Sequence, residues 1–279
     1  MADNNITEEE IKSYFANFHS EQLTSDEENQ QLLISFCANE YGTSLEEYLK
    51  KSAWVEDNAR HTKVYLIKNV KNSIVAYFAI KCGLLYEPRH CDIRTEEEKI
   101  FLDSILEAIS DANPEDIKKY REAGVATLGY EREDYIFNYA QEQIKFQQEK
   151  KTGGEKSFNV EMCHPAIELS HFCKAKENVD TVRDIPFGVG LFWEIIVPII
   201  IKIANTVGCK YLYLFAADMS DSTTQKLVEY YKVNLKFKID ESLIFIKPKY
   251  DMGCRCLCQS IADLENNKKW IWQQFIGDL

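Results

Sequence analysis

Residues 183–207 constrain the fold more than any other part of the chain. They read RDIPFGVGLFWEIIVPIIIKIANTV, so Gly188 and Gly190 follow a polar loop and open a long apolar segment. Glycines let a backbone come close to a ligand, and the first N–H groups of a helix lack intrahelical partners. The pattern therefore predicts a helix with an anion site at its start. An apolar helix of this kind is expected to be buried on more than one side and bent at Pro198.

The segments on either side of this helix suggest a fold. A short strand is predicted at 166–174 and a buried strand at 211–217, followed by a tyrosine-rich helix at 222–232 and a closing LKF at 235–237. This order resembles the acetyl-CoA-binding half of the GNAT N-acetyltransferase superfamily. A Rossmann nucleotide-binding unit is the alternative. It calls for a third glycine where Trp193 stands, and for an acidic residue at the end of the following strand.

The first half of the chain fits the same resemblance. Residues 6–18 are predicted to hold a short helix capped by Thr7 and Glu10. FCANEYGTSLEEYLKKSAW followed by TKVYLIKN resembles the opening of the bacterial GNAT branch that includes toxin-type acetyltransferases. The implied fold class is α/β (α+β), with a central mixed, mostly antiparallel sheet flanked by helices. The predicted elements here are a strand at 31–38, helices at 45–51 and 53–58, and a hairpin of strands at 63–68 and 74–85.

Residues 90–160 exceed a minimal GNAT domain and are predicted to form a helical insertion, with helices at 96–110, 114–122 and 131–150. The predicted domains are an acidic extension (1–30), the first GNAT half (31–89), the insertion (90–160), and the acetyl-CoA-binding half with its tail (161–279). The formal net charge is −12, and the acidity lies in the extension and the insertion. Because phosphate backbones are held mainly by Lys and Arg, nucleic acid is not expected as a partner. The insertion is instead expected to attract a cationic amine, or else to serve only as a solvated cap or dimer contact.

The resemblance implies where the cofactor lies. The pantetheine arm would bind backbone groups of the fourth strand, at Leu169, His171, Phe172 and Cys173. The pyrophosphate would lie over the glycine loop, formed by Phe187, Gly188, Val189, Gly190 and Leu191. The family has Gln or Arg three residues before the first glycine, whereas this chain has Ile185 there, and Arg183 is expected to substitute.

The resemblance also implies a tyrosine that protonates the leaving thiolate. Tyr231 occupies the second position of the aromatic–Tyr pair of the family, and Tyr230 is the alternative. Glu168 is the predicted base, because relatives place a carboxylate on this strand to take the proton of the amine. His171 is an alternative base. Residues 168 and 171 have opposite parity, so they face opposite sides of the strand unless a bulge intervenes.

Metal sites receive little support. His90-Cys91 and Cys163-His164 bracket the insertion, but neighbouring residues on a strand point apart. Cys254, Cys256 and Cys258 share one strand face and are expected to pack, so no metal is predicted. Nine cysteines without framework spacing, and a charged rather than apolar start, indicate a cytoplasmic protein. The longest apolar run is short for a bilayer and contains charges, so no membrane contact is expected.

The sequence thus predicts an enzyme that transfers the acetyl group of acetyl-CoA to a primary amine. Its partners would be a small-molecule or peptide amine, and a homodimer is an allowed assembly. The alternative is a catalytically silent GNAT-fold module that senses acetyl-CoA or docks a partner. The irregular glycine loop favours the silent module, whereas the tyrosine helix favours the enzyme.

Overall fold

The computed structural model describes residues 7–88, 93–151, 160–176, 181–182, 185–216, 221–246 and 254–276. The chain divides into two compact units. Unit 1 comprises Met1–Tyr86 and Cys163–Leu279, and unit 2 comprises Glu87–Met162. The four-part division derived from the sequence stays a prediction. Each unit is described by itself below.

Unit 1 is built on a six-stranded sheet with the order β1-β2-β3-β4-β7-β8. The β1–β2, β2–β3 and β7–β8 pairs are antiparallel, whereas β4 and β7 run parallel. The predicted mixed, mostly antiparallel sheet flanked by helices is therefore confirmed. The strands are β1 (His19–Gln22), β2 (Lys63–Lys68), β3 (Ile74–Pro88), β4 (Val160–Lys174), β7 (Tyr211–Ala216) and β8 (Arg255–Ser260), and the separate two-stranded ribbon is β5 (Thr181–Val182) with β6 (Ile185–Pro186).

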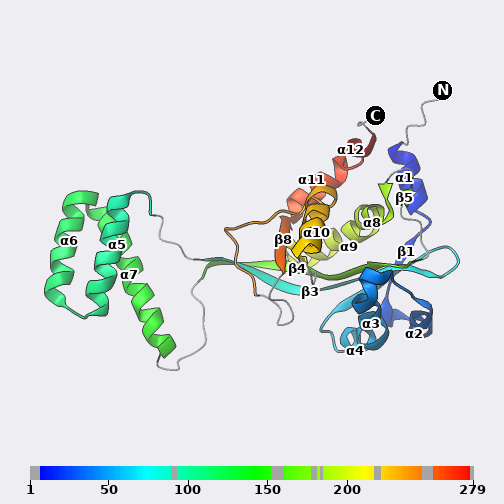
Figure 1. Ribbon diagram of the computed structural model, residues 1–279, viewed down its shortest axis with the longest axis horizontal. Coiled ribbons are helices and arrows are strands. Elements are labelled where there is room, and N and C mark those ends of the chain that lie inside the picture. Colours follow the sequence, from blue (N-terminus) through cyan, green and yellow to red (C-terminus); the bar gives the residue numbers. More distant parts are fainter. Residues whose placement is uncertain are drawn as a thin grey trace. The chain divides into compact units, whose positions relative to one another are not determined.

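Helices cover both faces of this sheet (Figure 1). One face carries the largest apolar cluster, to which α1, α8, α9, α10 and α11 all contribute. The other face is covered by α2, α3 and α4 over the β1–β3 half. The helices of unit 1 are α1 (Glu8–Phe15), α2 (Glu28–Leu32), α3 (Thr43–Lys51), α4 (Ala53–Asn58), α8 (Phe187–Leu191), α9 (Val197–Val207), α10 (Asp221–Asn234), α11 (Ile261–Trp270) and α12 (Gln273–Ile276), with 3₁₀ turns at Leu23–Ser25, Leu33–Ser35 and Glu40–Gly42.

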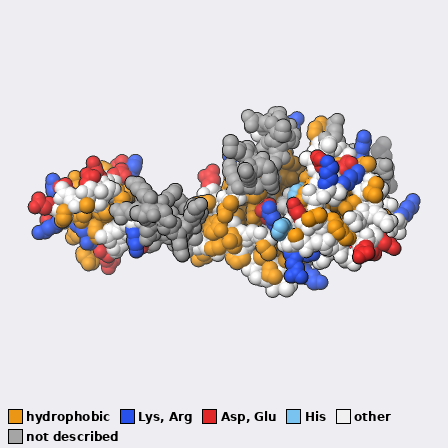
Figure 2. All heavy atoms as spheres, turned by 90° about the horizontal axis from the view of Figure 1, so that it is seen from below, with side chains coloured by type: hydrophobic (Ala, Val, Ile, Leu, Met, Phe, Trp, Pro, Cys, Tyr) orange, Lys and Arg blue, Asp and Glu red, His pale blue; other side chains and the backbone are white. Residues whose placement is uncertain are grey.

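On the second face, β7 and β8 are covered by a loop rather than a helix. Residues 238–246 start at β8, where Lys238 bridges Cys258, and then bury Leu243 on this face against Tyr213 and Cys256. Two backbone hydrogen bonds between Tyr86 and Ile244, 2.6 and 2.8 Å long, fix the loop to β3. Hydrophobic side chains gather on this side of unit 1 (Figure 2). Ile244 of the loop is itself exposed.

A single helix runs from Phe187 to Val207 through α8, a π-helical segment (Phe192–Ile196) and α9. Pro198 cannot donate the next hydrogen bond, and the wider π turn lies immediately before it. The helix ends where Gly208 adopts the left-handed conformation with φ 79°. By length and composition it could cross a membrane, but 61% of its most apolar window is buried inside the fold, as in a core helix.

The predicted first strand at 31–38 is wrong. These residues form the end of α2 and a 3₁₀ turn. The buried residues of this run have helical spacing: Leu33 and Phe36 are buried three residues apart, while Ile34 between them is 77% exposed. The edge strand is instead β1, with the sequence HSEQ, and so short and polar an edge gives no alternating pattern.

The closing LKF is not a strand either. Leu235 and Phe237 are buried in the main apolar cluster, and Lys236 between them has φ 61°. A left-handed residue interrupts an extended strand. The sheet is completed by β8, which pairs with β7 along six residues from Arg255 to Ser260.

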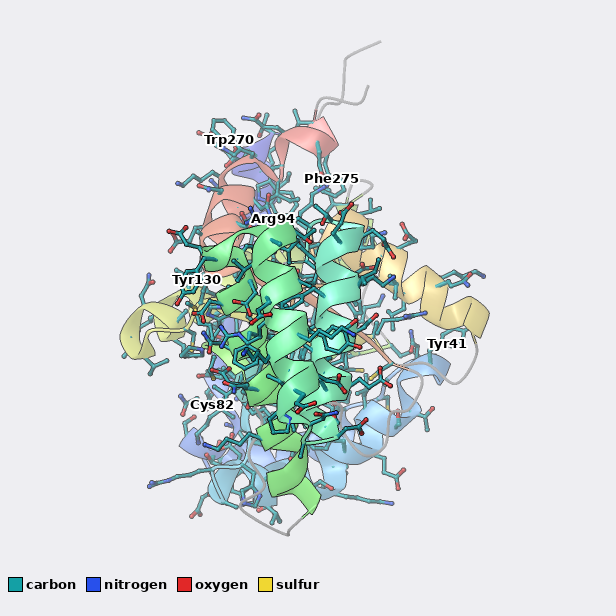
Figure 3. The ribbon with its side chains drawn as sticks, turned by 90° about the vertical axis from the view of Figure 1, so that its left-hand side faces the viewer. Tyr41, Cys82, Arg94, Tyr130, Trp270 and Phe275 are labelled. Atoms are coloured by element: carbon teal, nitrogen blue, oxygen red, sulfur yellow. The ribbon has the colours of Figure 1, made fainter. Side chains whose placement is uncertain are left out.

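Unit 2 is a bundle of three helices, α5 (Glu96–Ser110), α6 (Pro114–Leu128) and α7 (Tyr130–Lys151), close to the three predicted from the sequence. A capping box of Thr95 and Glu98 starts α5. Glu98 also pairs with Arg132 of α7 at 2.5 Å, so α5 and α7 begin at the same end of the bundle. Arg94 and Tyr130 lie near that end (Figure 3).

Gly190 lies where α1 meets the long helix. A Cβ atom there would be 1.8 Å from Cζ of the buried Phe15 ring, so the Gly190→Ala protein must displace this ring. We expect the free energy of unfolding to fall by about 1–3 kcal/mol, as for other overpacked cores. Chemical denaturation measures it, with Gly188→Ala as the control, because its added Cβ meets nothing closer than 3.4 Å. In Phe15→Ala protein, Gly190→Ala should cost less than in wild type, and equal costs would contradict this contact.

Candidate active site

The parallel strands β4 and β7 separate part-way along their length. Their register pairs Ala166 with Tyr211, Ile167 with Leu212 and Glu168 with Tyr213, and it ends there. Beyond Glu168, β4 continues without β7 as a partner, and a cleft of about 640 Å³ opens beside it. The described residues that line the cleft are Asn39, Tyr41, Gly42, Ser44, Leu45, Glu168, Leu169, Ser170, His171, Phe172, Cys173, Lys174, Leu214, Phe215, Leu227 and Tyr231.

The alternation of side chains along β4 slips by one residue beside the cleft. Leu169 packs in the apolar cluster around the long helix, and so does Phe172, three residues later. His171 and Cys173 contact the opposite side, where α3 lies. A strand without a bulge would place 169, 171 and 173 on one face. Because of this slip, Glu168 and His171 lie on the same face of β4.

His171 is held as a neutral imidazole between two protein groups. Its ring stacks on Tyr48 of α3, with centroids 3.8 Å apart and planes 6° from parallel. Its Nδ1 lies 3.1 Å from the hydroxyl of Ser170. Burial lowers the pKa of His171 to about 4, with nearby Lys81 adding to this effect and Glu56 opposing it. His171 is therefore neutral at physiological pH and can accept a hydrogen bond.

Glu168 is a buried carboxylate, 5% exposed, whose two oxygens both have partners. The hydroxyl of Tyr213 donates to Oε2 at 2.9 Å, and Nζ of Lys81 lies 3.0 Å from Oε1. The pKa of Tyr213 is raised, first by burial and then by this carboxylate. Glu168 thus lies at the floor of the cleft within a network of three residues.

The two tyrosines of α10 face different neighbours. Tyr231 lines the cleft, whereas the hydroxyl of Tyr230 lies 3.4 Å from where a side chain of Gly188 would begin. Neither hydroxyl has a hydrogen-bond partner among the residues that the structure describes. Burial raises the pKa of Tyr231 to about 12, so its hydroxyl keeps its proton at physiological pH. Tyr231 is therefore the tyrosine that can reach a molecule in the cleft.

The glycine loop proves to be the first turn of the helix itself, because α8 begins at Phe187. Gly188 faces Tyr230 and Phe172 and so adjoins the cleft-lining strand. Gly190 faces Phe15 instead, so its lack of a side chain serves packing rather than the approach of a phosphate. Phe187, Val189 and Leu191 are buried, as is Ile185. Arg183 lies outside the described residues.

The structure brings six of the thirteen predicted site residues together around one cleft. Glu168, Leu169, His171, Phe172, Cys173 and Tyr231 all line one cleft. Sequence reasoning did not find Lys81, Gly83 and Tyr213. Lys81 and Gly83 lie two residues apart on β3, and Tyr213 lies within the buried strand β7. Nothing in the sequence around them differs from that of other strand residues. Only the tertiary pairing of Tyr213 with Glu168 distinguishes them.

No group of three or more potential metal ligands occurs within the described parts of the chain, and His90 and Cys91 lie outside them. Cys254, Cys256 and Cys258 are buried. Burial raises the pKa of the Cys258 thiol to about 11, which disfavours the thiolate that a metal requires.

No protein-family model matches the chain, and no curated protein matches its sequence. Solved structures of two toxins are similar in fold. A mutant of the toxin AtaT aligns over 90% of this chain and 93% of its own, with 10% identity and a TM-score of 0.47. AtaTR bound with AcCoA covers 90% and 98%, with 11% identity and a TM-score of 0.45. A mutant of KacT covers 90% and 98%, with 11% identity and a TM-score of 0.46.

These similarities correct one expectation. We excluded nucleic acid as a partner because the chain is acidic, and we expected a small-molecule or peptide amine, cationic in character. AtaT has been solved in complex with acetyl-methionyl-tRNAfMet and, with AtaR, bound to DNA. A net charge summed over a chain does not fix the sign of the potential at one surface, so the exclusion was wrong.

The half-buried His171 should make stability depend on pH. Its folded pKa of about 4 lies below the usual 6.5, so the neutral form contributes stability above pH 6.5 that is lost as pH falls towards 4. The loss amounts to about 3 kcal/mol. We expect His171→Asn protein to lose less stability than wild type between pH 7 and 4.5 in urea denaturation. The exposed His61 provides the control, since His61→Asn protein should follow wild type. Equal losses in all three proteins would contradict the burial of His171.

Proposed function

We propose that this protein is an N-acetyltransferase that moves the acetyl group of acetyl-CoA to a primary amine. The observation that carries the proposal is the separation of β4 and β7 beneath Tyr231. A parallel pair that separates exposes unpaired backbone N–H and C=O groups along one side of β4. Such a row can bind an extended, amide-containing arm in the manner of an added strand. Pantetheine is an arm of this kind.

In this proposal the cofactor lies along β4 with its pyrophosphate near the start of the long helix. The N–H groups at Phe187, Gly188 and Val189 belong to the first turn, where helices leave donors free for anions. Gly188 adjoins Phe172 of β4, so the helix start and the cleft are contiguous. Arg183 stays a proposed phosphate contact. Gly190 would contribute only through its place in the helix.

Tyr231 would act on the leaving group. When the amine attacks the thioester carbonyl, the C–S bond breaks and negative charge develops on the sulfur. The Tyr231 hydroxyl, with a pKa near 12, is protonated throughout the physiological range and can donate to that sulfur. Complete proton transfer to a thiolate of pKa about 8.5 is uphill, so the hydrogen bond itself supplies the stabilisation.

The amine would approach from the other face of β4, where His171 and Glu168 lie. These two groups are the candidates for taking the proton that the amine loses on attack, directly or through one water. The loop before α3 borders this side, and Asn39 of the loop and Ser44 of α3 line the cleft. Tyr41 of the same loop is 79% exposed and lies at the edge of unit 1 (Figure 3).

A charge at Gly188 should weaken cofactor binding. Gly188→Asp places a carboxylate beside the helix start, where it would repel a pyrophosphate. We expect the dissociation constant for acetyl-CoA, measured by calorimetry, to rise at least tenfold. Gly188→Ala controls for the loss of glycine, since its Cβ fits at 3.4 Å, and it should change affinity by less than about threefold. Unchanged affinity in the Asp variant would remove the pyrophosphate from this position.

Removing the Tyr231 hydroxyl should impair catalysis but not binding. Tyr231→Phe keeps the ring that packs on Phe237, so the fold should be retained. Loss of one positioned hydrogen-bond donor to a developing negative charge costs about 10²–10³-fold in kcat. Thiol release from acetyl-CoA with a panel of primary amines, aminoacylated RNA included, measures kcat. Tyr230→Phe is the matched control on the same helix. A larger loss for Tyr230→Phe than for Tyr231→Phe would transfer the role to Tyr230.

A further inference from the structure

Lys81 and Tyr213, two residues without a role in the proposal, converge on the carboxylate of Glu168. Glu168 and Tyr213 are the last pair in the parallel register, so their side chains leave the sheet at the point where β4 and β7 part. Tyr213 donates to one oxygen of Glu168 at 2.9 Å, and Lys81 of β3 reaches the other at 3.0 Å. One buried side chain therefore ties three neighbouring strands together.

Gly83 makes room for this arrangement. A Cβ atom at Gly83 would lie 2.2 Å from the Tyr213 hydroxyl and 2.5 Å from its ring atom Cε1. No side chain fits there, because Tyr213 of β7 extends over β4 as far as Gly83 of β3 while its hydroxyl donates to Glu168 of β4. The glycine on β3 and the tyrosine on β7 are thus complementary in shape, which fixes the direction of the Tyr213 side chain.

These contacts occupy both carboxylate oxygens of Glu168, which are the atoms that would have to accept a proton. To take a proton, Glu168 would have to give up its ion pair and leave the Lys81 ammonium, 34% exposed, without its counter-charge. His171, on the same face of β4, has no such ion pair and is neutral. The geometry therefore separates a group that can accept a proton from a group that is held.

We propose that Lys81, Glu168 and Tyr213 form a clasp that fixes where β4 and β7 separate, and that Glu168 positions the strands rather than accepting the proton of the amine. Lys81 and Tyr213 act through Glu168, so all three are positioning residues. The clasp sets the floor of the cleft and thereby the width available to the arm of the cofactor. This inference rests on the proposed acetyl-CoA function.

The test compares Glu168→Gln with Glu168→Gln/Lys81→Met. Glutamine can still accept from Tyr213, but it leaves the Lys81 ammonium unneutralised. A clasp predicts that Glu168→Gln weakens acetyl-CoA binding about tenfold and that the double variant recovers to within about threefold of wild type. It also predicts that the pH profile of kcat keeps its shape. A base predicts a loss of about 10²–10⁴-fold in kcat at unchanged affinity, an altered pH profile and no recovery in the double variant. That second result would overturn the clasp.

The exposed pair of Glu47 and Lys51 on α3 supplies the control. Glu47→Gln/Lys51→Met removes an i,i+4 ion pair at the surface, and it should change neither affinity nor melting temperature measurably.

If wild-type protein does not bind acetyl-CoA, the proposed function fails, and the clasp is judged by thermal unfolding alone. The double variant must then melt at a higher temperature than Glu168→Gln, because it no longer contains a Lys81 ammonium without its counter-charge. Additive decreases in melting temperature would overturn the clasp.

Discussion

Beyond Glu168 and Tyr213, the backbones of β4 and β7 no longer hydrogen-bond to each other, and every candidate functional group lies around that gap. Unpaired backbone groups next to an apolar core are costly unless water or a ligand satisfies them. Leu169 and Leu214 belong both to the apolar core and to the lining of the cleft. If the gap closed around dry apolar side chains, the backbone N–H and C=O groups along it would stay unpaired. The sheet therefore maintains a row of donors and acceptors that an amide-rich ligand can satisfy.

The long helix can supply one end of this site only because distant segments hold it in place. Its π segment is braced by the C-terminal part of the chain, where Lys268 donates to the carbonyl of Trp193 at 2.7 Å and Trp272 donates to Glu194 at 2.7 Å. On another side, Phe15 of α1 occupies the space left by Gly190. Elements from both ends of unit 1 thus fix the helix start beside Tyr230. Helices α1 and α11 thus influence the site indirectly, because they hold the long helix in position.

Local signals were sufficient for most helices and strands. Thr7 with Glu10, and Asn113 with Pro114, mark helix starts that the structure reproduces, because a cap satisfies backbone donors within four residues. The polar edge strand β1 was missed for the opposite reason. An edge strand needs no apolar face, and its pairing with β2 is a tertiary fact.

The same distinction applies within the site. Leu169, His171 and Tyr231 could be assigned to the cleft from the order of the elements, because that order fixes which strand and helix lie side by side. The slip along β4 could not be read from the chain, since a bulge depends on how β3 and α3 pack against it. The purpose of Gly190 was also hidden. A glycine that admits a phosphate and a glycine that admits a phenyl ring look alike in a sequence.

Charge shows why global composition misled us about partners. Glu168 is the only acidic residue among the described residues that line the cleft, and the Lys81 ammonium balances it. His171 beside it is neutral at physiological pH. The cleft therefore offers no spare negative charge to draw in a cation, although the chain as a whole carries −12. Coulomb attraction between exposed groups fades over about 8 Å in physiological salt, so acidity elsewhere in the chain does not set the preference at the cleft. What enters is decided by the shape and hydrogen bonding of the groups around β4.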